Sequence, residues 1–487
     1  MAYLVGERHQ AQLFPASVED YIRSEDPVRA YDAFVDQLDF KDLDIIYDED
    51  QIGPPEYDPK AMVKLLVYGY SYGERSSRKL ERATRHNLSF IWLTGGLKPD
   101  HKTIARFRRD HRGGLKNILK QCARLCLKLG LIEGNTLFVD GSKIRANASS
   151  KHNWTKKRCD EVLAQTDCQI EALLAECEAT DLAEEEQESL VQMQEELKDK
   201  EALKAKVQQI LKELKETNQT SLNTTDPDSR PMKGRQGSHN SYNLQNTVDD
   251  QHGLIVSTDV VTDANDQNQF SSQVNQANDT LQKTCETACG DAGYANTDDS
   301  KIIDDQQIKV VIPSQKQASS SPGKPFDKDS FKYDPQRDCY ICPEGHLLTY
   351  RSTNRRENQR HYRAARPALC RACPHFGVCT KAAQGRSIIR LVNEQLKEKL
   401  EKQYLQPDSQ AIYKRRKEKV ELPFGHLKRN LKVVAFLLRG VAGVRAEGSL
   451  LSTSFNMARV TTLLGVSGFI EKIKQAQKDG QMALSTA

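Results

Sequence analysis

The feature that most constrains the fold is a repeated switch between helical and strand periodicity along 487 residues. Short apolar runs bounded by polar turns predict strands at 137–139, 242–248, 254–261 and 309–312. Long segments with helical spacing separate them. We therefore expect an α/β core of three to five strands in a sheet flanked by helices, assembled from pieces far apart in the sequence.

The first 130 residues are expected to form a helical domain. Asp26-Pro27 and Asp58-Pro59 each place a capping Asp before a Pro at the first helical position, ahead of apolar residues at helical spacing. A further helix over 102–112 carries basic residues, among them Arg106 and Arg108, which predicts a DNA-binding helix. An ordinary all-helical bundle would give a similar pattern, so that alternative stays open.

Residues 154–217 predict a coiled-coil-like helical hairpin. Two apolar stripes follow the three-and-four spacing of a helix, and a break lies near 180–183. The stripes are Leu190, Met193 and Leu197, then Leu203, Val207, Ile210 and Leu214. We interpret this insertion as a structural or partner-binding arm rather than a chemical site.

Charge is segregated along the chain, although the net charge is only +4, from 71 basic and 67 acidic residues. Basic residues number seven in 98–118, six in 351–366 and eight in 413–432, whereas 176–201 carries eleven carboxylates. Outside that acidic stretch the protein is distinctly basic, which indicates a polyphosphate partner. The alternative is that each cluster is a solvated helix face.

Composition argues against secretion and membrane insertion. No run approaches the ~18 apolar residues of a membrane helix, and the first ten residues lack the apolar core of a signal peptide. In a reducing interior, the 12 cysteines are expected to be free thiols or metal ligands rather than disulfides.

Five cysteines fall within 41 positions and have the spacing of zinc ligands. Two cysteines with two residues between them let a tight turn offer both sulfurs to one tetrahedral Zn²⁺. Four thiolate ligands leave no open coordination position, so such a site would be structural. The alternative is a set of buried, reduced thiols. The candidates are Cys339, Cys342, Cys370, Cys373 and Cys379, one more than zinc needs.

Three carboxylates could together supply metal-dependent phosphoryl transfer. Asp140 ends a predicted strand, Asp291 lies between Gly290 and Gly293, and Glu421 lies on a basic helix. Cutting a phosphodiester uses two divalent cations roughly 3.5–4 Å apart, and Mg²⁺ prefers carboxylate oxygens. Taken singly, the three are equally compatible with an Asp-Gly turn, a loop Asp before a helix, and a surface Glu paired with Lys417.

With these motifs in view, the chain resembles bacterial insertion-sequence transposases of the DDE type, in the group with a helical N-terminal domain and a Cys-rich insertion. The resemblance covers nearly the whole chain and is most specific around Glu421. It is carried by Pro99-Asp100-His101-x-Thr103-Ile104-x-Arg106-Phe107-Arg108, Val139-Asp140-Gly141-Ser142-Lys143, Gly290-Asp291-Ala292-Gly293-Tyr294 and Tyr413-x-x-Arg416-x-x-x-Val420-Glu421-x-x-Phe424-Gly425-x-x-Lys428.

The resemblance implies a ribonuclease-H-like mixed sheet in which Asp140, Asp291 and Glu421 bind two Mg²⁺ or Mn²⁺ ions. It implies that Arg416 and Lys428 contact DNA and that Tyr413 contacts or positions a strand. It also implies structural zinc on four of the five clustered cysteines and leaves Cys339 as the spare thiol. These four ligands are Cys342, Cys370, Cys373 and Cys379.

The resulting expectation is a helical DNA-binding domain over 1–130, a catalytic domain over 131–465 and a flexible tail over 466–487. Insertions at 154–217 and 325–390 interrupt the catalytic domain. The expected function is that of a transposase in the bacterial cytoplasm, associated with the nucleoid, that binds element ends as a homodimer, cleaves their 3′ boundaries and joins the 3′-hydroxyls to target DNA. An inactive zinc-containing DNA-binding regulator and a metal-dependent nuclease without strand transfer are the alternatives.

Overall fold

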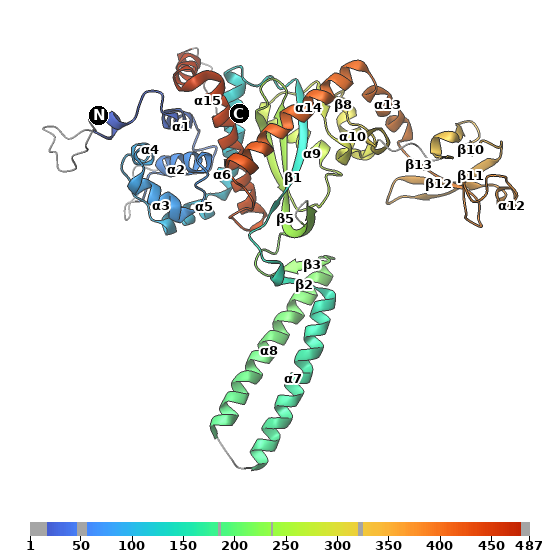
Figure 1. The fold of residues 1–487 in the computed structure, drawn as a ribbon, viewed down its shortest axis with the longest axis horizontal. Helices are drawn as coiled ribbons and strands as arrows, with labels where there is room; N and C mark the ends of the chain where they lie inside the picture. Colours follow the sequence, from blue (N-terminus) through green and yellow to red (C-terminus); the bar gives the residue numbers. More distant parts are fainter. Residues whose placement is uncertain (1–16, 46–55, 184–186, 235–236, 320–324, 479–487) are drawn as a thin grey trace, which may run out of the picture. The chain divides into compact units, whose positions relative to one another are not determined.

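The computed structural model describes residues 17–45, 56–183, 187–234, 237–319 and 325–478 (Figure 1). The chain divides into two compact units. The first comprises residues up to Asp266 with 275–284 and 418–487, and the second comprises 267–274 and 285–417. The expected boundary at residue 130 does not separate units, because the N-terminal helices share the first unit with strands and with the C-terminal helix.

Helices make up the N-terminal part of the first unit. Both predicted Asp-Pro starts are confirmed, since Asp26 accepts a hydrogen bond from the Val28 amide at 3.0 Å and Asp58 accepts one from the Lys60 amide at 2.8 Å. The helical elements are η1 (Val18–Tyr21), α1 (Pro27–Asp36), α2 (Pro59–Ser71), α3 (Ser77–His86), α4 (Leu88–Leu93), α5 (His101–Asp110) and α6 (Arg112–Lys128).

The strands of the first unit form antiparallel ladders around one long strand. β5 (Gly237–Asp249) pairs with β1 (Thr136–Arg145), with β4 (Arg230–Gly234) and with β6 (Ile255–Val261). The predicted hairpin between 242–248 and 254–261 is therefore confirmed as β5 and β6. The α/β character of the chain is confirmed as well.

The last helix, α15 (Gly440–Lys478), packs on α6, α2, α1 and β6 within the first unit. Its helical backbone is broken only at Gly465, where φ is +70°. The prediction of a flexible tail is wrong for 466–478, because Val466, Phe469 and Ile473 follow helical spacing and are buried. Residues 479–487 lie outside the described residues.

A buried ion pair joins α15 to the turn after α2. Arg75 Nη1 lies 2.9 Å from Glu447 Oε1, and the fully buried Glu447 also accepts from the Leu437 and Leu438 amides, each at 2.9 Å. Burial raises the pKa of the Glu447 carboxyl above its usual value, against the effect of Arg75. Arg108 supports the pair by donating to the Arg75 carbonyl at 2.7 Å.

The insertion is a pair of helices, α7 (Lys156–Ala183) and α8 (Gln187–Glu216), which lie side by side and are closed by β2 (Asn153–Thr155) and β3 (Ser221–Asn223) (Figure 1). Its buried apolar residues gather at the strand end and include Val207, Ile210 and Leu214 with Leu222. Leu203 is 38% exposed, so the predicted stripe does not continue unbroken. The side chains of Leu190 and Met193 lie outside the described residues.

The second unit contains a parallel strand pair with helices. β7 (Thr287–Cys289) pairs with β8 (Lys309–Val311), and both strands are almost entirely buried, as parallel strands usually are. Helices α9 (Phe270–Leu281) and α14 (Pro407–Gly425) each have residues in both units. The remaining helical elements are η3 (Ala292–Tyr294), α10 (Thr297–Asp304), α11 (Gln315–Ala318) and α13 (Glu394–Tyr404).

The Cys-rich segment forms a five-stranded antiparallel sheet that the sequence did not predict. Its strand order is β13-β12-β11-β10-β9, and one face holds an apolar cluster around Tyr340 and Tyr362. The elements are η4 (Lys328–Ser330), β9 (Lys332–Asp334), β10 (Cys339–Ile341), β11 (Leu347–Asn354), β12 (Gln359–Ala364), α12 (Pro367–Arg371) and β13 (Ser387–Leu391). Among the described residues, no helix is both long and apolar enough to cross a bilayer.

Candidate active site

Asp140 lies in the middle of β1, not at its end as predicted. The strand begins with three fully buried apolar residues, Leu137 to Val139, and continues through Asp140 to Arg145. The antiparallel ladder with β5 accounts for the difference, because it pairs Asp140 with Asn246 and holds the polar half of the strand in register. The alternative of an Asp-Gly turn at this position is therefore wrong as well.

Gly141 is tightly packed next to Asp140. A Cβ atom at this position would lie 2.4 Å from Gln245 Nε2 and 2.6 Å from Asp266 Oδ1, both far inside van der Waals contact. Asn243 and Gln245 donate to Asp266 at 2.8 and 2.7 Å and so fix its carboxylate against the strand. Sequence reasoning missed Asp266 because it lies in a polar loop with no periodic pattern.

One groove brings Asp140 and Glu421 together within the first unit. It has a volume of about 950 Å³ and is lined by β1, β5 and the end of α14 with the turn that follows. Among the described residues, these two are the only carboxylates that line it. Its basic side chains are Lys143, Arg145, Lys428 and Arg429. A groove with two carboxylates among four cations can accept a phosphate backbone while leaving oxygen ligands for a divalent ion.

Lys428 lies in a five-residue π-helical segment, His426–Asn430, that directly follows α14. Such segments change which side chains share a helix face and are frequent at functional sites. Lys428 Nζ donates to Ser142 Oγ at 2.5 Å and lies 5.9 Å from the centre of the Phe424 ring. Lys428, for which a DNA contact is predicted, is thus held at the groove by Ser142 of β1.

Asp291 belongs to the second unit, two residues beyond β7. Its carboxylate accepts from the Gly293 amide at 2.8 Å and lies 3.5 Å from the Arg416 guanidinium. Arg416 is buried and this ion pair holds its guanidinium, while its contact with DNA stays a prediction. Tyr413 packs edge-on against Tyr404 at 5.3 Å, and burial raises the pKa of its hydroxyl.

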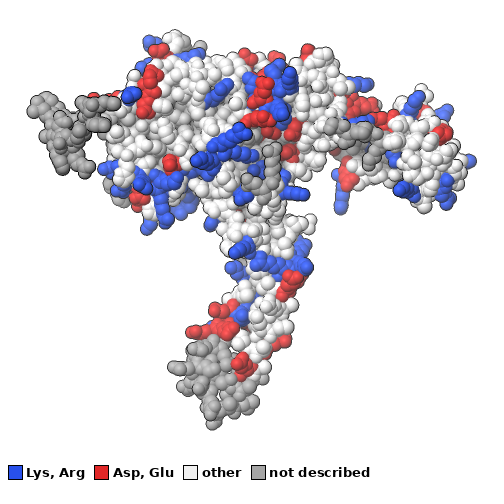
Figure 2. Space-filling model, viewed as in Figure 1, with Lys and Arg blue, Asp and Glu red and all other residues white. Residues whose placement is uncertain are grey.

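The two basic residues expected on the N-terminal DNA-binding helix have different surroundings. Arg106 on α5 is exposed. Arg108 is buried at 5% exposure and donates to Tyr70 and to the Arg75 carbonyl, so its expected DNA contact is wrong because its charge is held inside the helical bundle. Lys and Arg are dense where α3 and α5 reach the surface (Figure 2). The exposed ones are Arg78, Lys79, Arg82, Arg85, Lys102, Arg106 and Arg109.

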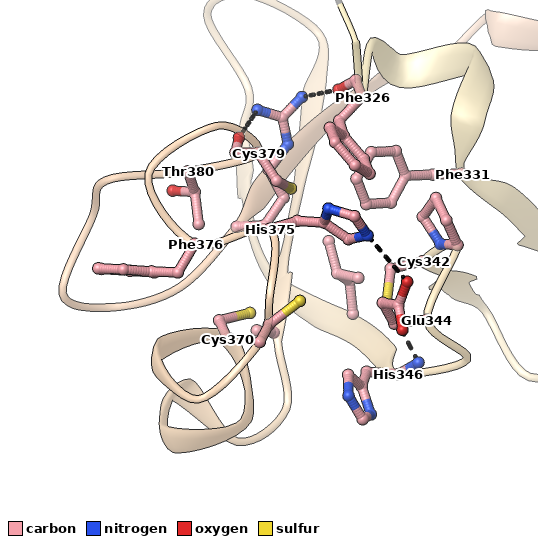
Figure 3. A pocket seen from close by; sticks show the side chains of 15 residues that line it. Phe326, Phe331, Cys342, Glu344, His346, Cys370, His375, Phe376, Cys379 and Thr380 are labelled. Atoms are coloured by element: carbon pink, nitrogen blue, oxygen red, sulfur yellow. Dashed lines mark hydrogen bonds and ion pairs between the residues drawn. The ribbon is translucent and has the colours of Figure 1, made fainter.

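Four of the predicted zinc ligands line one small cavity of about 30 Å³ in the Cys-rich segment, whereas buried Cys339 does not line it. The lining thiols are Cys342, Cys370, Cys373 and Cys379. Figure 3 shows Cys342, Cys370 and Cys379 on different sides of the cavity. In the described part of the chain, no group of three or more His, Cys, Asp or Glu side chains is arranged to hold a metal ion.

The surroundings of the cysteine cavity act on its thiols in different ways. The His346 amide donates to Cys342 Sγ at 3.2 Å. Burial raises the pKa of the Cys379 thiol, and the three neighbouring cysteines raise it further. All described cysteines carry free thiols.

Two family models match the chain. A transposase domain (DUF772) matches residues 16–110, and a transposase DDE domain matches residues 341–461. Together these matches support a DDE transposase of an insertion sequence. No curated protein and no solved structure matches it.

The matched ranges cover different parts of the chain. The DDE match includes the Cys-rich sheet from Ile341 onward, the helix with Glu421 and the first half of α15. Asp140 and Asp291 lie outside both ranges. The matches therefore support a transposase function, while the case for those two carboxylates rests on their surroundings.

Proposed function

We propose that this transposase binds the DNA ends of its element, hydrolyses their 3′ boundaries and uses the freed 3′-hydroxyls to attack target DNA. The observation that carries the proposal is the groove in which Asp140 and Glu421 are surrounded by four cationic side chains. Both reactions are in-line displacements at phosphorus, so one site can serve both.

In the proposed reaction, some residues of this chain would neutralise phosphate charge and others would position the metal-binding carboxylates. Lys428, which donates to Ser142, would neutralise DNA phosphates along the groove together with Arg429. This neutralisation would let the DNA backbone approach the carboxylates of the groove, which carry the same negative charge. The pairing of β1 with β5 would keep Asp140 opposite Asn246 and so hold its carboxylate in position. Asp140, Asp291 and Glu421 are the proposed ligands of two Mg²⁺ or Mn²⁺ ions, which when bound would activate the attacking oxygen and stabilise the leaving oxygen.

The test is cleavage of labelled DNA that flanks the native gene, in Mg²⁺ or Mn²⁺. We expect Asp140→Asn, Asp291→Asn and Glu421→Gln each to reduce cleavage at least 100-fold, in the range of the ~10²–10³-fold loss seen when one group that stabilises developing charge is removed. Glu418→Gln, an exposed carboxylate on the same helix as Glu421, is the matched control and should cleave normally. Wild-type rates in all three variants would refute the assignment.

Two further readouts separate the alternative functions. A nuclease without strand transfer would release cut products but never join a labelled 3′ end to a target plasmid. An inactive regulator would bind the same DNA without any metal-dependent nicking by the wild-type protein.

We also propose that the Cys-rich segment binds one structural Zn²⁺ through the four thiols that line its cavity. Their chemistry and shared cavity support zinc, and binding would draw the sulfurs together and release their protons. Purified protein should contain about one zinc per chain, and Cys373→Ser should lose it whereas Cys339→Ser keeps it. Zinc-free protein whose thermal unfolding is unchanged by chelator would contradict the proposal.

The paired ends of an element require two active sites, so we propose that the chain acts as a homodimer on DNA. The α7–α8 pair is one candidate contact, because two long helices lying side by side offer surface area for a partner. Light scattering with and without end DNA would measure the assembly. Unchanged association after deletion of residues 156–216 would remove the arm from this role.

A further inference from the structure

A loop in the Cys-rich segment presents apolar side chains to solvent. Between Cys373 and Cys379, the loop 374–378 leaves Phe376 40% exposed and Val378 66% exposed. Figure 3 shows the Phe376 ring pointing away from the cysteine cavity, while His375 points into it. Exposed apolar residues occur singly on most proteins, but two at one loop tip form a small apolar projection.

The loop is held in one shape by its own hydrogen bonds. The Phe376 amide donates to the Cys373 carbonyl at 3.0 Å, and the Gly377 amide donates to the Thr380 carbonyl at 2.9 Å. Gly377 has a φ of +94°, a conformation that a side chain would strain. A preformed projection loses little conformational entropy when it binds a partner.

His375 anchors the loop from the inside. Its ring packs on Phe326 with centroids 4.6 Å apart, and its Nε2 lies 3.1 Å from Glu344 Oε1. The two adjacent side chains point in different directions, the His375 ring toward Phe326 and the Phe376 ring away from it, although each side chain is about 40% exposed. This arrangement fixes the direction of the Phe376 ring.

The segment of sequence that contains the loop is strongly basic. Residues 343–386 contain nine Arg and Lys against two Glu, a net charge of +7. Lys and Arg predominate on the visible face of this segment (Figure 2). The exposed cations in the part of the segment nearest the loop in sequence are Arg363, Arg366, Arg371 and Lys381. A surface with this charge is complementary to a phosphate backbone.

We propose that this loop inserts Phe376 between base pairs of duplex DNA while the surrounding cations bind the flanking phosphates. Proteins that unstack a base step use single apolar side chains as wedges beside basic residues. A membrane is the poorer partner, because insertion into lipid needs a broad apolar face and this loop offers two side chains. The inference rests on the proposed DNA-binding function and adds a second DNA contact, in the Cys-rich sheet.

The test is binding of full-length protein to a duplex from the native flanking DNA, without divalent metal so that no cleavage occurs. Phe376→Ala should bind about 5- to 100-fold more weakly, the range for loss of one aromatic–base contact. Val392→Ala, which changes an apolar residue directly after β13 that is 48% exposed, is the control and should bind like the wild type. Phe376→Trp retains an aromatic wedge and should retain affinity, and its fluorescence should be quenched by DNA.

The salt dependence of DNA binding and binding to lipid vesicles provide further tests of the proposal. Arg371→Gln and Lys381→Gln should each lower the salt dependence of binding by about one phosphate contact. Equal affinities for Phe376→Ala and Val392→Ala would overturn the proposal, as would Phe376-dependent binding to anionic phospholipid vesicles with unchanged DNA binding. Intact Phe376-dependent binding would support this proposal whatever the triad variants do. Loss of cleavage in the triad variants together with equal affinities of Phe376→Ala and Val392→Ala would refute this proposal alone.

Discussion

Replacing Arg75 by Met tests the buried ion pair with Glu447. The variant keeps the two backbone amides that donate to Glu447 but removes its cation, and the carboxylate has no solvent contact. Breaking a buried pair by removing one partner costs about 3–5 kcal/mol. Because two hydrogen bonds remain, we expect about 3 kcal/mol, or a fall of roughly 1 M in the urea midpoint for an m value near 3 kcal/mol/M.

The loss of stability in the Arg75→Met variant should also depend on pH. Burial raises the pKa of Glu447 in the folded protein, so its ionisation opposes folding as pH rises above the ordinary value of 4.5. Removing Arg75 raises that pKa further. The destabilisation should therefore be largest at pH 8 and should shrink as pH falls toward 5, where the buried carboxyl takes up a proton.

Urea unfolding followed by circular dichroism at pH 5 and pH 8 measures both effects. Adding Glu447→Gln to the Arg75→Met variant should recover stability at pH 8, because it removes the unpaired charge. Lys301→Met, which breaks the exposed pair with Asp305, is the control and should change little. A midpoint shift that is the same at both pH values would refute the reasoning.

Three further substitutions test other parts of the fold. Gly141→Ala should reduce DNA cleavage at least tenfold, because its methyl group would lie 2.4 Å from Gln245, whereas Gly113→Ala has open space and should cleave normally in the same assay. Phe469→Ala should cost about 3–5 kcal/mol in urea unfolding, since its ring is 1% exposed; no change would mean that 466–478 is loose after all. Val207→Ala should lower the melting temperature of the helical pair, measured by circular dichroism, while Leu203→Ala, at 38% exposure, should not.

The parts of the fold that the sequence predicted are those governed by local signals. The Asp-Pro caps at Asp26 and Asp58 satisfy amides two residues away, and the β5–β6 hairpin joins neighbouring strands. Such interactions leave a readable pattern because both partners lie in one window of sequence. The α7–α8 pair was likewise predictable from its period.

The parts that could not be predicted depend on distant partners. β1 continues past Asp140 because β5, about a hundred residues later, pairs with its polar half. Arg108 resembles a surface cation in sequence, yet its partners are Tyr70 and the carbonyl of Arg75, more than thirty residues earlier. Asp266 is next to the candidate site only because Asn243 and Gln245 hold it there.

The central position of Asp140 within a hydrogen-bonded ladder also sets how quickly the site can change shape. Backbone amides in such a ladder exchange with solvent only when the strands separate, which is orders of magnitude rarer than the motion of a loop. The carboxylate is therefore positioned before any substrate arrives, and the adjustment that accompanies binding must come from the helical side of the groove. Deuterium uptake that is slow over 137–145 and faster over 421–430 would be the signature of that division.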